Sequence, residues 1–275
     1  MLVDSIIDDL GIGAIMHFAG SIVVPESVEQ PLKYYANNTL ASHALISAAV
    51  DAGVKHILFS STAAVYGAPE RVPIVEDDPK LPINPYGASK LMTERMLEDA
   101  SAAHPFNYGA LRYFNVAGAD PEGRTGQIGK GSTHLIKVAV EAAVGKRDKV
   151  AVYGDDYPTR DGTCIRDYIH VSDLAAAHVA ALDWLTRHPD ENLVMNCGYG
   201  NGLSVLEVLD AVDRANGNPV RRVMERRRAG DPPALVAGNG RLLEMFDWRP
   251  AFADIDRIVA DALAWEKKLT ERAIA

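Results

Sequence analysis

Short apolar runs alternate with longer helical stretches along most of the chain, and this alternation limits the possible folds more than any other feature. The runs AIMHFAG, VKHILFSS and YGALRYFN, at 14–20, 54–61 and 108–115, are rich in β-branched and aromatic residues. Helical stretches follow the first two of them, at 26–52 and 86–103. Parallel strands are buried on both faces and need helical connections. The first half is therefore predicted to form a parallel sheet covered by helices.

A glycine-rich segment at 118–132, GADPEGRTGQIGKGS, predicts a loop at the boundary with a second, smaller domain. After it, the same alternation predicts helices at 133–145, 172–186, 203–216, 239–246 and 253–272, and strands at 149–154 and 192–198. We therefore predict an α/β protein of two domains. Residues 1–117 hold a doubly wound parallel sheet. Residues 118–275 form mainly the smaller α/β domain, with segments that return to the sheet.

Composition and charge exclude several classes of protein. No apolar run approaches the roughly 20 residues that cross a bilayer, and the N-terminus lacks the basic region of a signal peptide, so a cytoplasmic location is expected. A net charge of −9 disfavours nucleic-acid binding, which needs a broad basic surface. Cys164 and Cys197 are isolated, and the histidines show no HExxH spacing, so no metal site is predicted.

Two glycine-containing segments resemble nucleotide-binding loops but lack the required spacing. In GRTGQIGKGS, Gly123 is one residue too far from the GK pair, and Lys130 is followed by glycine instead of serine or threonine. In GYGNGLS, at 198–204, the glycines do not form G-x-G-x-x-G. Both segments are interpreted as ordinary loops.

NPYGASK, at 84–90, carries the strongest chemical signal. Asn84 can cap a helix that has Pro85 at its first position, and Tyr86 and Lys90 then lie on one helix face. A phenol has a pKa of about 10, and a nearby ammonium stabilises its phenolate, so the pair can remove a proton from an alcohol. Because this spacing also occurs by chance, an ordinary polar pair on a surface helix is the alternative.

The segment FSSTAAVYG, at 59–67, favours the catalytic interpretation. It places Ser60, Ser61 and Thr62 at the carboxyl end of a predicted parallel strand, where open α/β sheets bind ligands. A hydroxyl there can orient the alcohol of a substrate while Tyr86 takes its proton.

Segments spread in order over nearly the whole chain resemble the extended short-chain dehydrogenase/reductase family and, within it, the UDP-glucose 4-epimerases. DGTCIRDYIHV is the most specific of them. The segments are HFAG, YYANN, FSSTAAVYG, PYGASK, LRYFNVAGADPEG, GDDYPTRDGTCIRDYIHVSDLA and RRAGDPPA.

The resemblance implies a Rossmann-like NAD-binding domain and a UDP-sugar-binding domain, and it implies catalytic roles. Tyr86 is the base that deprotonates the 4-hydroxyl of the sugar, and Lys90 lowers its pKa and contacts the nicotinamide ribose. Thr62 shares the hydrogen bond to that oxygen. Hydride passes to NAD, the 4-keto sugar turns in the pocket, and hydride returns to its other face, which interconverts UDP-glucose and UDP-galactose.

Ligand contacts also follow from the resemblance. Besides Tyr86 and Lys90, the positions implied to contact NAD are Phe18, Ala19, Gly20, Asn37 and Phe114. The positions implied to hold the UDP-sugar are Asn115, His134, Leu135, Tyr153, Arg166, Arg228 and Asp231. Arginines suit a diphosphate because they are charge-assisted donors, although ERRR at 225–228 can also be a solvated charge run.

Several positions depart from the family pattern. Ala63 and Ala64 follow Thr62 where a related 4,6-dehydratase needs an acid/base carboxylate pair, so dehydration is disfavoured. Ile22 stands where some relatives have lysine, and His134 stands where asparagine is common. Leu235 occupies the position that controls room for an N-acetyl group, so acceptance of N-acetylated UDP-sugars stays open.

The sequence contains no Gly-rich dinucleotide fingerprint. We expect that two βα units, about 60 residues, are missing before Met1 and that the chain as written binds NAD weakly or not at all. The alternatives are a noncatalytic remnant that keeps a nucleotide-sugar pocket, or another UDP-sugar epimerase or dehydrogenase of the same family. The family also implies a homodimer.

Overall fold

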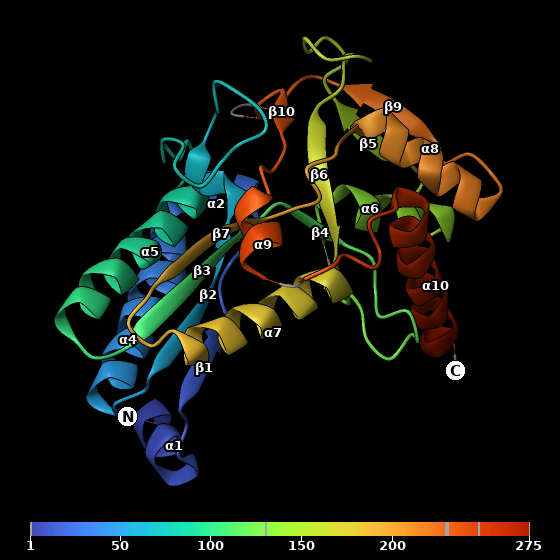
Figure 1. The fold of residues 1–275 in the computed structure, drawn as a ribbon. Coiled ribbons are helices and arrows are strands. Elements are labelled where there is room, and N and C mark those ends of the chain that lie inside the picture. The colour runs from blue at the N-terminus through green and yellow to red at the C-terminus, as the bar shows by residue number, and fades with distance from the viewer. Residues whose placement is uncertain (1, 130, 229–230, 247, 275) are drawn as a thin grey trace.

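Four parallel strands form the larger sheet of the computed structural model, which describes residues 2–129, 131–228, 231–246 and 248–274. The strands lie in the order β1 (Ala14–His17), β2 (His56–Thr62), β3 (Asn107–Tyr113) and β7 (Leu193–Cys197) (Figure 1). β2, β3 and β7 keep one register, in which Phe59 pairs with Ala110 and Ala110 with Val194. The predicted α/β class with a parallel sheet is confirmed.

Helices cover both faces of this sheet, because successive residues of a strand point to opposite sides. Ile57 and Phe59 of β2 pack toward α4 (Ala41–Asp51) and α5 (Pro85–Ala103), together with α1 (Leu2–Leu10). Leu58 and Leu111 point the other way, into a core shared with α7 (Val171–Arg187) and α9 (Gly240–Met245). Figure 1 shows α4 and α5 on one side of the sheet and α7 on the other.

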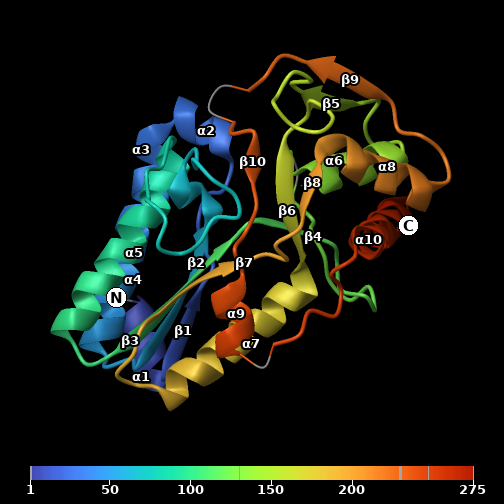
Figure 2. The ribbon, with the colours of Figure 1, turned by 45° about the horizontal axis from the view of Figure 1, so that its top comes forward.

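The predicted single helix over 26–52 is wrong, because the structure divides this segment. It contains α2 (Val24–Glu29), α3 (Pro31–Tyr34), the π-helix Tyr35–Leu40 and α4. Pro31 begins α3, because proline has no N–H and its ring clashes with a preceding helical turn. α2 and α3 lie beside one end of α5 in Figure 2 and pack against it.

The second group of elements contains smaller sheets that the sequence predicted only in part. β10 (Ala234–Leu235), β6 (Ile165–His170) and β4 (Asn115–Ala117) are parallel neighbours, and β8 (Gly202–Ser204) runs antiparallel to β6. β5 (Val150–Tyr153) pairs with β9 (Arg222–Glu225). Only β5 was predicted, because the other strands are short or lack an apolar run.

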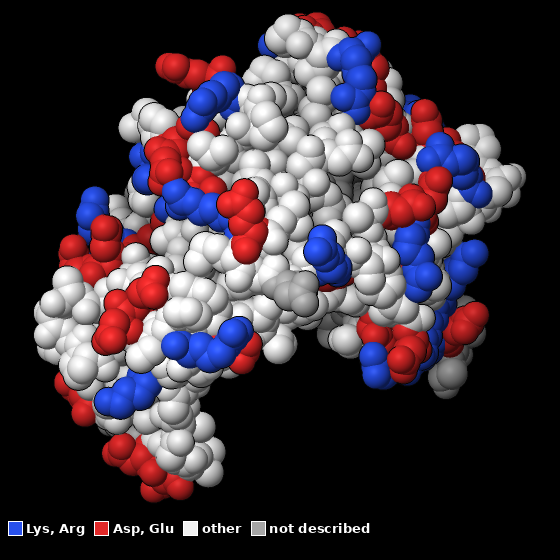
Figure 3. All heavy atoms as spheres, in the orientation of Figure 1, with Lys and Arg blue, Asp and Glu red and all other residues white. Residues whose placement is uncertain are grey.

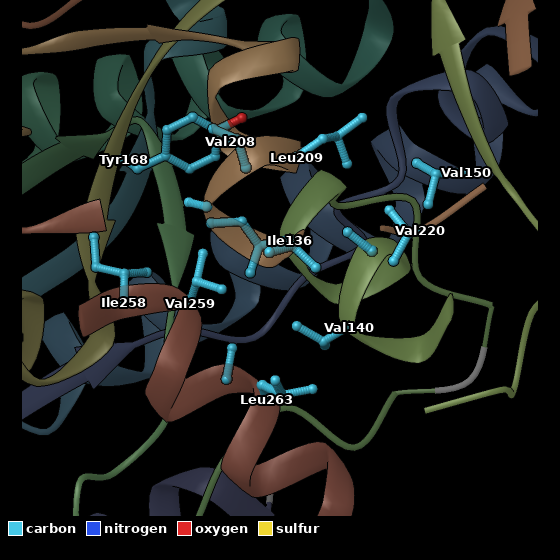
Figure 4. Packing of buried hydrophobic residues seen from close by; sticks show 14 of the residues in the cluster. Ile136, Val140, Val150, Tyr168, Val208, Leu209, Val220, Ile258, Val259 and Leu263 are labelled. Carbon is cyan, nitrogen blue, oxygen red and sulfur yellow. The ribbon is translucent and has the colours of Figure 1, made fainter. Parts of the chain in front are cut away.

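Helices α6 (Leu135–Ala143), α8 (Val205–Asn216) and α10 (Ile255–Ile274) enclose the core of this second group. Figure 4 shows Ile136, Leu209 and Val259, one from each helix, pointing toward one another. The ends of α8 follow from local sequence. Ser204 and Glu207 form a capping box at its start, and Gly217 ends it in the left-handed conformation.

Charged side chains of both signs alternate over the face of the molecule shown in Figure 3. Among the helices of the described ranges, none combines the length and hydropathy of a membrane span. Lys130 of the rejected phosphate-loop motif lies outside the described residues.

Replacement of Leu111 by alanine should destabilise the protein strongly. Leu111 is fully buried in β3, and its truncation leaves a cavity between the sheet and α7, so the free energy of unfolding should fall by about 2–5 kcal/mol. Leu81→Ala is the control, because Leu81 is 70% exposed and its truncation should cost less than about 0.5 kcal/mol. Urea denaturation of both variants measures the difference, and equal losses would contradict the described packing.

Candidate active site

A cavity of about 1610 Å³ lies where the two groups of elements meet. The larger sheet contributes the carboxyl ends of β2 and β3, with Thr62 and Tyr113, and α5 contributes Tyr86 and Lys90. The second group contributes α6, β5 and β6, among them Tyr153. Open α/β sheets bind ligands beyond the carboxyl ends of their strands, so this cavity is the candidate active site.

The start of α5 is built as the sequence predicted. Asn84 accepts a hydrogen bond from the backbone N–H of Gly87 at 2.8 Å, and Pro85 occupies the first turn. On the facing segment, Thr62 ends β2 and accepts a hydrogen bond from the N–H of Ala64 at 3.2 Å. Local caps therefore hold both backbones that present side chains to the cavity.

Gly87 allows these two backbones to meet. A Cβ atom at Gly87 would lie 2.5 Å from the carbonyl oxygen of Ala64, which is closer than any real contact. The approach brings Tyr86 within hydrogen-bonding reach of Thr62. The glycine of PYGASK is thus needed for packing, and only the tertiary structure reveals this reason.

Lys90 is 3% exposed and is held against β2. Its ammonium donates to the carbonyl oxygen of Ser60 at 2.9 Å and lies 4.8 Å from the centre of the Phe59 ring. Burial lowers the pKa of Lys90 to about 8, because an ammonium loses its hydration in the protein interior. The side chain therefore stays mostly charged at neutral pH.

The pKa of Tyr86 is not lowered by Lys90, although the resemblance implied this. Burial raises the pKa of Tyr86 above its ordinary value, and the hydrogen bond with Thr62 opposes this effect only in part. The ammonium of Lys90 is bonded to Ser60 instead of the phenol. In the protein alone Tyr86 is therefore a neutral phenol at neutral pH, and this corrects the expectation.

Of the positions implied to contact NAD, only some line the cavity. Phe18 and Phe114 line it, and Phe18 is 54% exposed. Gly20 lies close to Lys90: a Cβ atom at Gly20 would lie 3.5 Å from the Lys90 ammonium nitrogen. Asn37 donates to the side-chain oxygen of Ser21 at 2.8 Å. Ala19, Gly20 and Asn37 lie outside the lining described for the cavity.

These residues fit the nicotinamide ribose end of the cofactor. A charged donor, a phenol and an aromatic wall converge there, and Gly20 leaves the approach to Lys90 open. The Gly-rich loop that cradles a pyrophosphate is absent from the sequence, so no such loop completes the other end of the cofactor site within the described residues.

All positions implied to hold a UDP-sugar line the other part of the cavity: Asn115, His134, Leu135, Tyr153, Arg166, Arg228 and Asp231. The Arg228 guanidinium lies 3.8 Å from the centre of the Tyr153 ring, and Arg166 forms an ion pair with Asp231. Arg228 is therefore not part of a purely solvated charge run. Ile22 and Leu235, two departures from the family pattern, also line the cavity.

Two further residues line the cavity. The sequence gave no role to Tyr113, and it offered Ser60 only as one of three hydroxyls that could orient a substrate. The Tyr113 hydroxyl contacts the side-chain oxygen of Ser60, and both side chains face the cavity beside Tyr86. Tyr113 ends a strand next to Thr62, its register partner, and that position was the available signal. Among the described residues, no group of three or more metal-ligating side chains is arranged to hold an ion.

Comparisons with known proteins show the family to which the chain belongs. Residues 2–198 match the model of the NAD dependent epimerase/dehydratase family. A UDP-glucose 4-epimerase of Azospirillum brasilense is 58% identical over 270 residues, which cover 98% of this chain and 77% of that protein. A UDP-glucose 4-epimerase of Streptomyces lividans is 47% identical over 93% of this chain and 76% of its own length.

Solved structures are similar as well. The UDP-glucose 4-epimerase of Stenotrophomonas maltophila, with bound NAD and formylated UDP-arabinopyranose, has a TM-score of 0.94 and 36% identity, over 98% of this chain and 81% of that chain. The enzyme of Bifidobacterium longum, in complex with NAD+ and UDP, has a TM-score of 0.92 and 41% identity, over 97% of this chain and 80% of that chain.

Proposed function

Because the chain belongs to the NAD dependent epimerase/dehydratase family, we propose that it interconverts UDP-glucose and UDP-galactose with NAD as its cofactor. One observation carries the proposal beyond family membership. Thr62, Tyr86 and Lys90 meet at one part of a cavity whose other part holds Arg166 and Arg228. Proton-transfer groups and diphosphate-binding groups therefore face the same space.

Tyr86 and Thr62 act on the 4-hydroxyl of the sugar. Both side chains line the cavity and lie within interacting reach of each other, so an alcohol oxygen beside them can contact each of them. Tyr86 first loses its own proton to solvent; as a phenolate it takes the proton of the hydroxyl as C4 is oxidised and returns it as C4 is reduced. The raised pKa of Tyr86 favours the proton-donating form that the return step uses. When bound, NAD accepts the hydride from C4 and gives it back.

Lys90 supports this proton transfer electrostatically. In the protein alone Lys90 does not lower the pKa of Tyr86, so its charge acts on the phenolate that forms during the reaction, and this attraction is stronger in the interior than in water because the local dielectric constant is low. The carbonyl of Ser60 holds the ammonium by one donor, so further donors stay free for a ribose hydroxyl.

Arg166 and Arg228 hold the diphosphate at the other end of the cavity. Stacking on Tyr153 orients the Arg228 guanidinium, and Asp231 orients that of Arg166. A diphosphate fixed by these donors tethers the nucleotide, and the cavity of about 1610 Å³ leaves room for the sugar to turn between the two hydride transfers.

The competing functions predict different products. Ala63 and Ala64 line the cavity beside Thr62 and cannot transfer protons, so dehydration lacks its acid/base pair. A UDP-sugar dehydrogenase would accumulate NADH, and a noncatalytic remnant would bind UDP-sugar without turnover. Incubation of the protein with UDP-galactose and added NAD, followed by separation of the sugar nucleotides, distinguishes them. UDP-glucose without lasting NADH supports the proposal, and lasting NADH contradicts it.

We also propose that residues 1–117 form mainly the NAD-binding part and residues 118–275 mainly the UDP-sugar-binding part. The return of β7 to the larger sheet supports the expectation that segments of the second part complete the first. A homodimer and a cytoplasmic location stay predictions. Light scattering of the purified protein measures the first of these, and cell fractionation the second.

Tyr86→Phe should abolish most epimerisation, because it removes the oxygen that transfers the proton and keeps the ring. We expect kcat to fall by about 10²- to 10⁴-fold with little change in fold. Tyr108→Phe is the matched control, since Tyr108 is buried near the opposite end of β3, away from the cavity. Full activity of Tyr86→Phe in a sugar-nucleotide assay would show that Tyr86 is not the base.

The activity should rise with pH up to about 8 and then level off. The reactive form combines a Tyr86 phenolate with a charged Lys90, and the pKa of Tyr86 is raised whereas that of Lys90 is lowered to about 8. Below about pH 8 each rise in pH increases the phenolate fraction, and above it the loss of the ammonium offsets this gain. Lys90→Arg keeps its charge, so its kcat should continue to rise above about pH 8. A profile that levels off at the same pH in a folded Lys90→Arg protein would assign this limit to another group.

A further inference from the structure

A buried network behind the cavity connects α5 to β2 and β3 through side chains that no part of the proposed mechanism uses. Glu94 lies four residues after Lys90 and eight after Tyr86, so the three side chains share one face of α5. The Glu94 carboxylate accepts a hydrogen bond from the hydroxyl of Ser61 in β2. It also accepts hydrogen bonds from Arg112 in β3, from Nε at 2.9 Å and from Nη2 at 2.6 Å.

These contacts fix α5 to β2 directly beside Thr62. Lys90 donates to the carbonyl of Ser60, and Ser61 donates to Glu94, so α5 holds two consecutive residues that directly precede Thr62. The position of the Thr62 hydroxyl relative to Tyr86 therefore depends on how these two contacts set α5 against the strand.

Arg112 holds the segment on the other side of Thr62. Its Nη1 donates to the hydroxyl of Tyr66 at 2.9 Å and to the carbonyl of Glu76 at 3.0 Å. Tyr66 ends the short 3-10 helix Ala63–Tyr66 that begins directly after Thr62, and its hydroxyl donates to Asn196 of β7 at 2.7 Å. Thr62 thus lies between two segments that are both tied to the same ion pair.

The network is buried and does not reach the ligands. The side chains of Arg112 and Glu94 are 5% and 7% exposed, and neither they nor Ser61 and Tyr66 line the cavity. Burial alone lowers the pKa of Arg112, but the Glu94 carboxylate raises it above its ordinary value, so the guanidinium stays charged. A buried ion pair is often no more stabilising than a packed apolar pair, so stability alone does not explain its presence.

We propose that Ser61, Glu94 and Arg112 are positioning residues for the epimerisation, which set the Thr62 hydroxyl against the Tyr86 phenol without touching substrate or cofactor. The inference rests on the proposed function for its kinetic consequence. The alignment of Thr62 with Tyr86 does not depend on which alcohol reacts.

Ser61→Ala tests the proposal, because it removes the link from Glu94 to β2 and leaves the ion pair intact. We expect kcat to fall by about 10- to 100-fold, since small misplacements of reacting groups have effects of this size, while KM for the UDP-sugar changes little. The Thr62 hydrogen bond lowers the pKa of Tyr86, so its misalignment should also raise the pKa of Tyr86, which ultraviolet titration measures.

Ser204→Ala is the matched control. Ser204 is also fully buried and donates to a carboxylate, that of Asp161, but it lies in β8 and outside the cavity lining. Thermal unfolding should show a loss of stability in both variants, whereas only Ser61→Ala should change kcat and the pKa of Tyr86. Unchanged kcat and an unchanged pKa of Tyr86 in folded Ser61→Ala would overturn the proposal.

Glu94→Gln is a second variant, and ultraviolet titration of Tyr86 is a second measurement. If Ser61→Ala does not fold, Glu94→Gln keeps the shape of the side chain and loses its charge, and the same kinetic changes are expected. If the wild-type protein does not turn over UDP-galactose, the proposed function fails. Ultraviolet titration of Tyr86, assigned with Tyr86→Phe, then tests the alignment alone. A higher pKa of Tyr86 in Ser61→Ala supports the positioning role, and an unchanged pKa overturns it.

Discussion

The close approach of α5 to the end of β2 is the physical constraint on which the candidate site depends. The backbone of α5 meets the 3-10 helix that follows β2 at Gly87, where any larger residue would collide with the carbonyl of Ala64. Lys90 then reaches the backbone of Ser60, and the buried carboxylate of Glu94 reaches the hydroxyl of Ser61. One helix face therefore carries the proposed base Tyr86 and two side chains that hold the helix against the sheet.

Electrostatics bears on how an acidic chain could hold the anionic nucleotide of the proposed function. The net charge is −9, so the positive potential for a diphosphate has to be local. Arg166 and Arg228 are the arginines proposed for this role, and a carboxylate and an aromatic ring restrict their side chains. Restricted donors lose less conformational entropy when they bind a ligand, which would favour binding by these two arginines.

The fold divides these tasks between its two groups of elements. The groups proposed for proton transfer lie at the carboxyl ends of strands of the larger sheet and on α5, and the smaller sheets and the segments beside them carry the arginines proposed to bind the nucleotide. The cavity exists only where both groups meet. Its chemistry therefore depends on how the C-terminal segments return to the larger sheet, as β7 does beside β3.

Local patterns in the sequence determined the strands of the larger sheet, the cap at Asn84 and the spacing of Tyr86 and Lys90, because each depends on residues near in the chain. The break at Pro31 is also local in origin, although it was not predicted. Local patterns did not determine the short strands β4, β6, β8, β9 and β10, which form only through pairing with distant partners. The raised pKa of Tyr86 and the burial of Glu94 with Arg112 were likewise decided by tertiary structure, because desolvation depends on what surrounds a group and not on its neighbours in sequence.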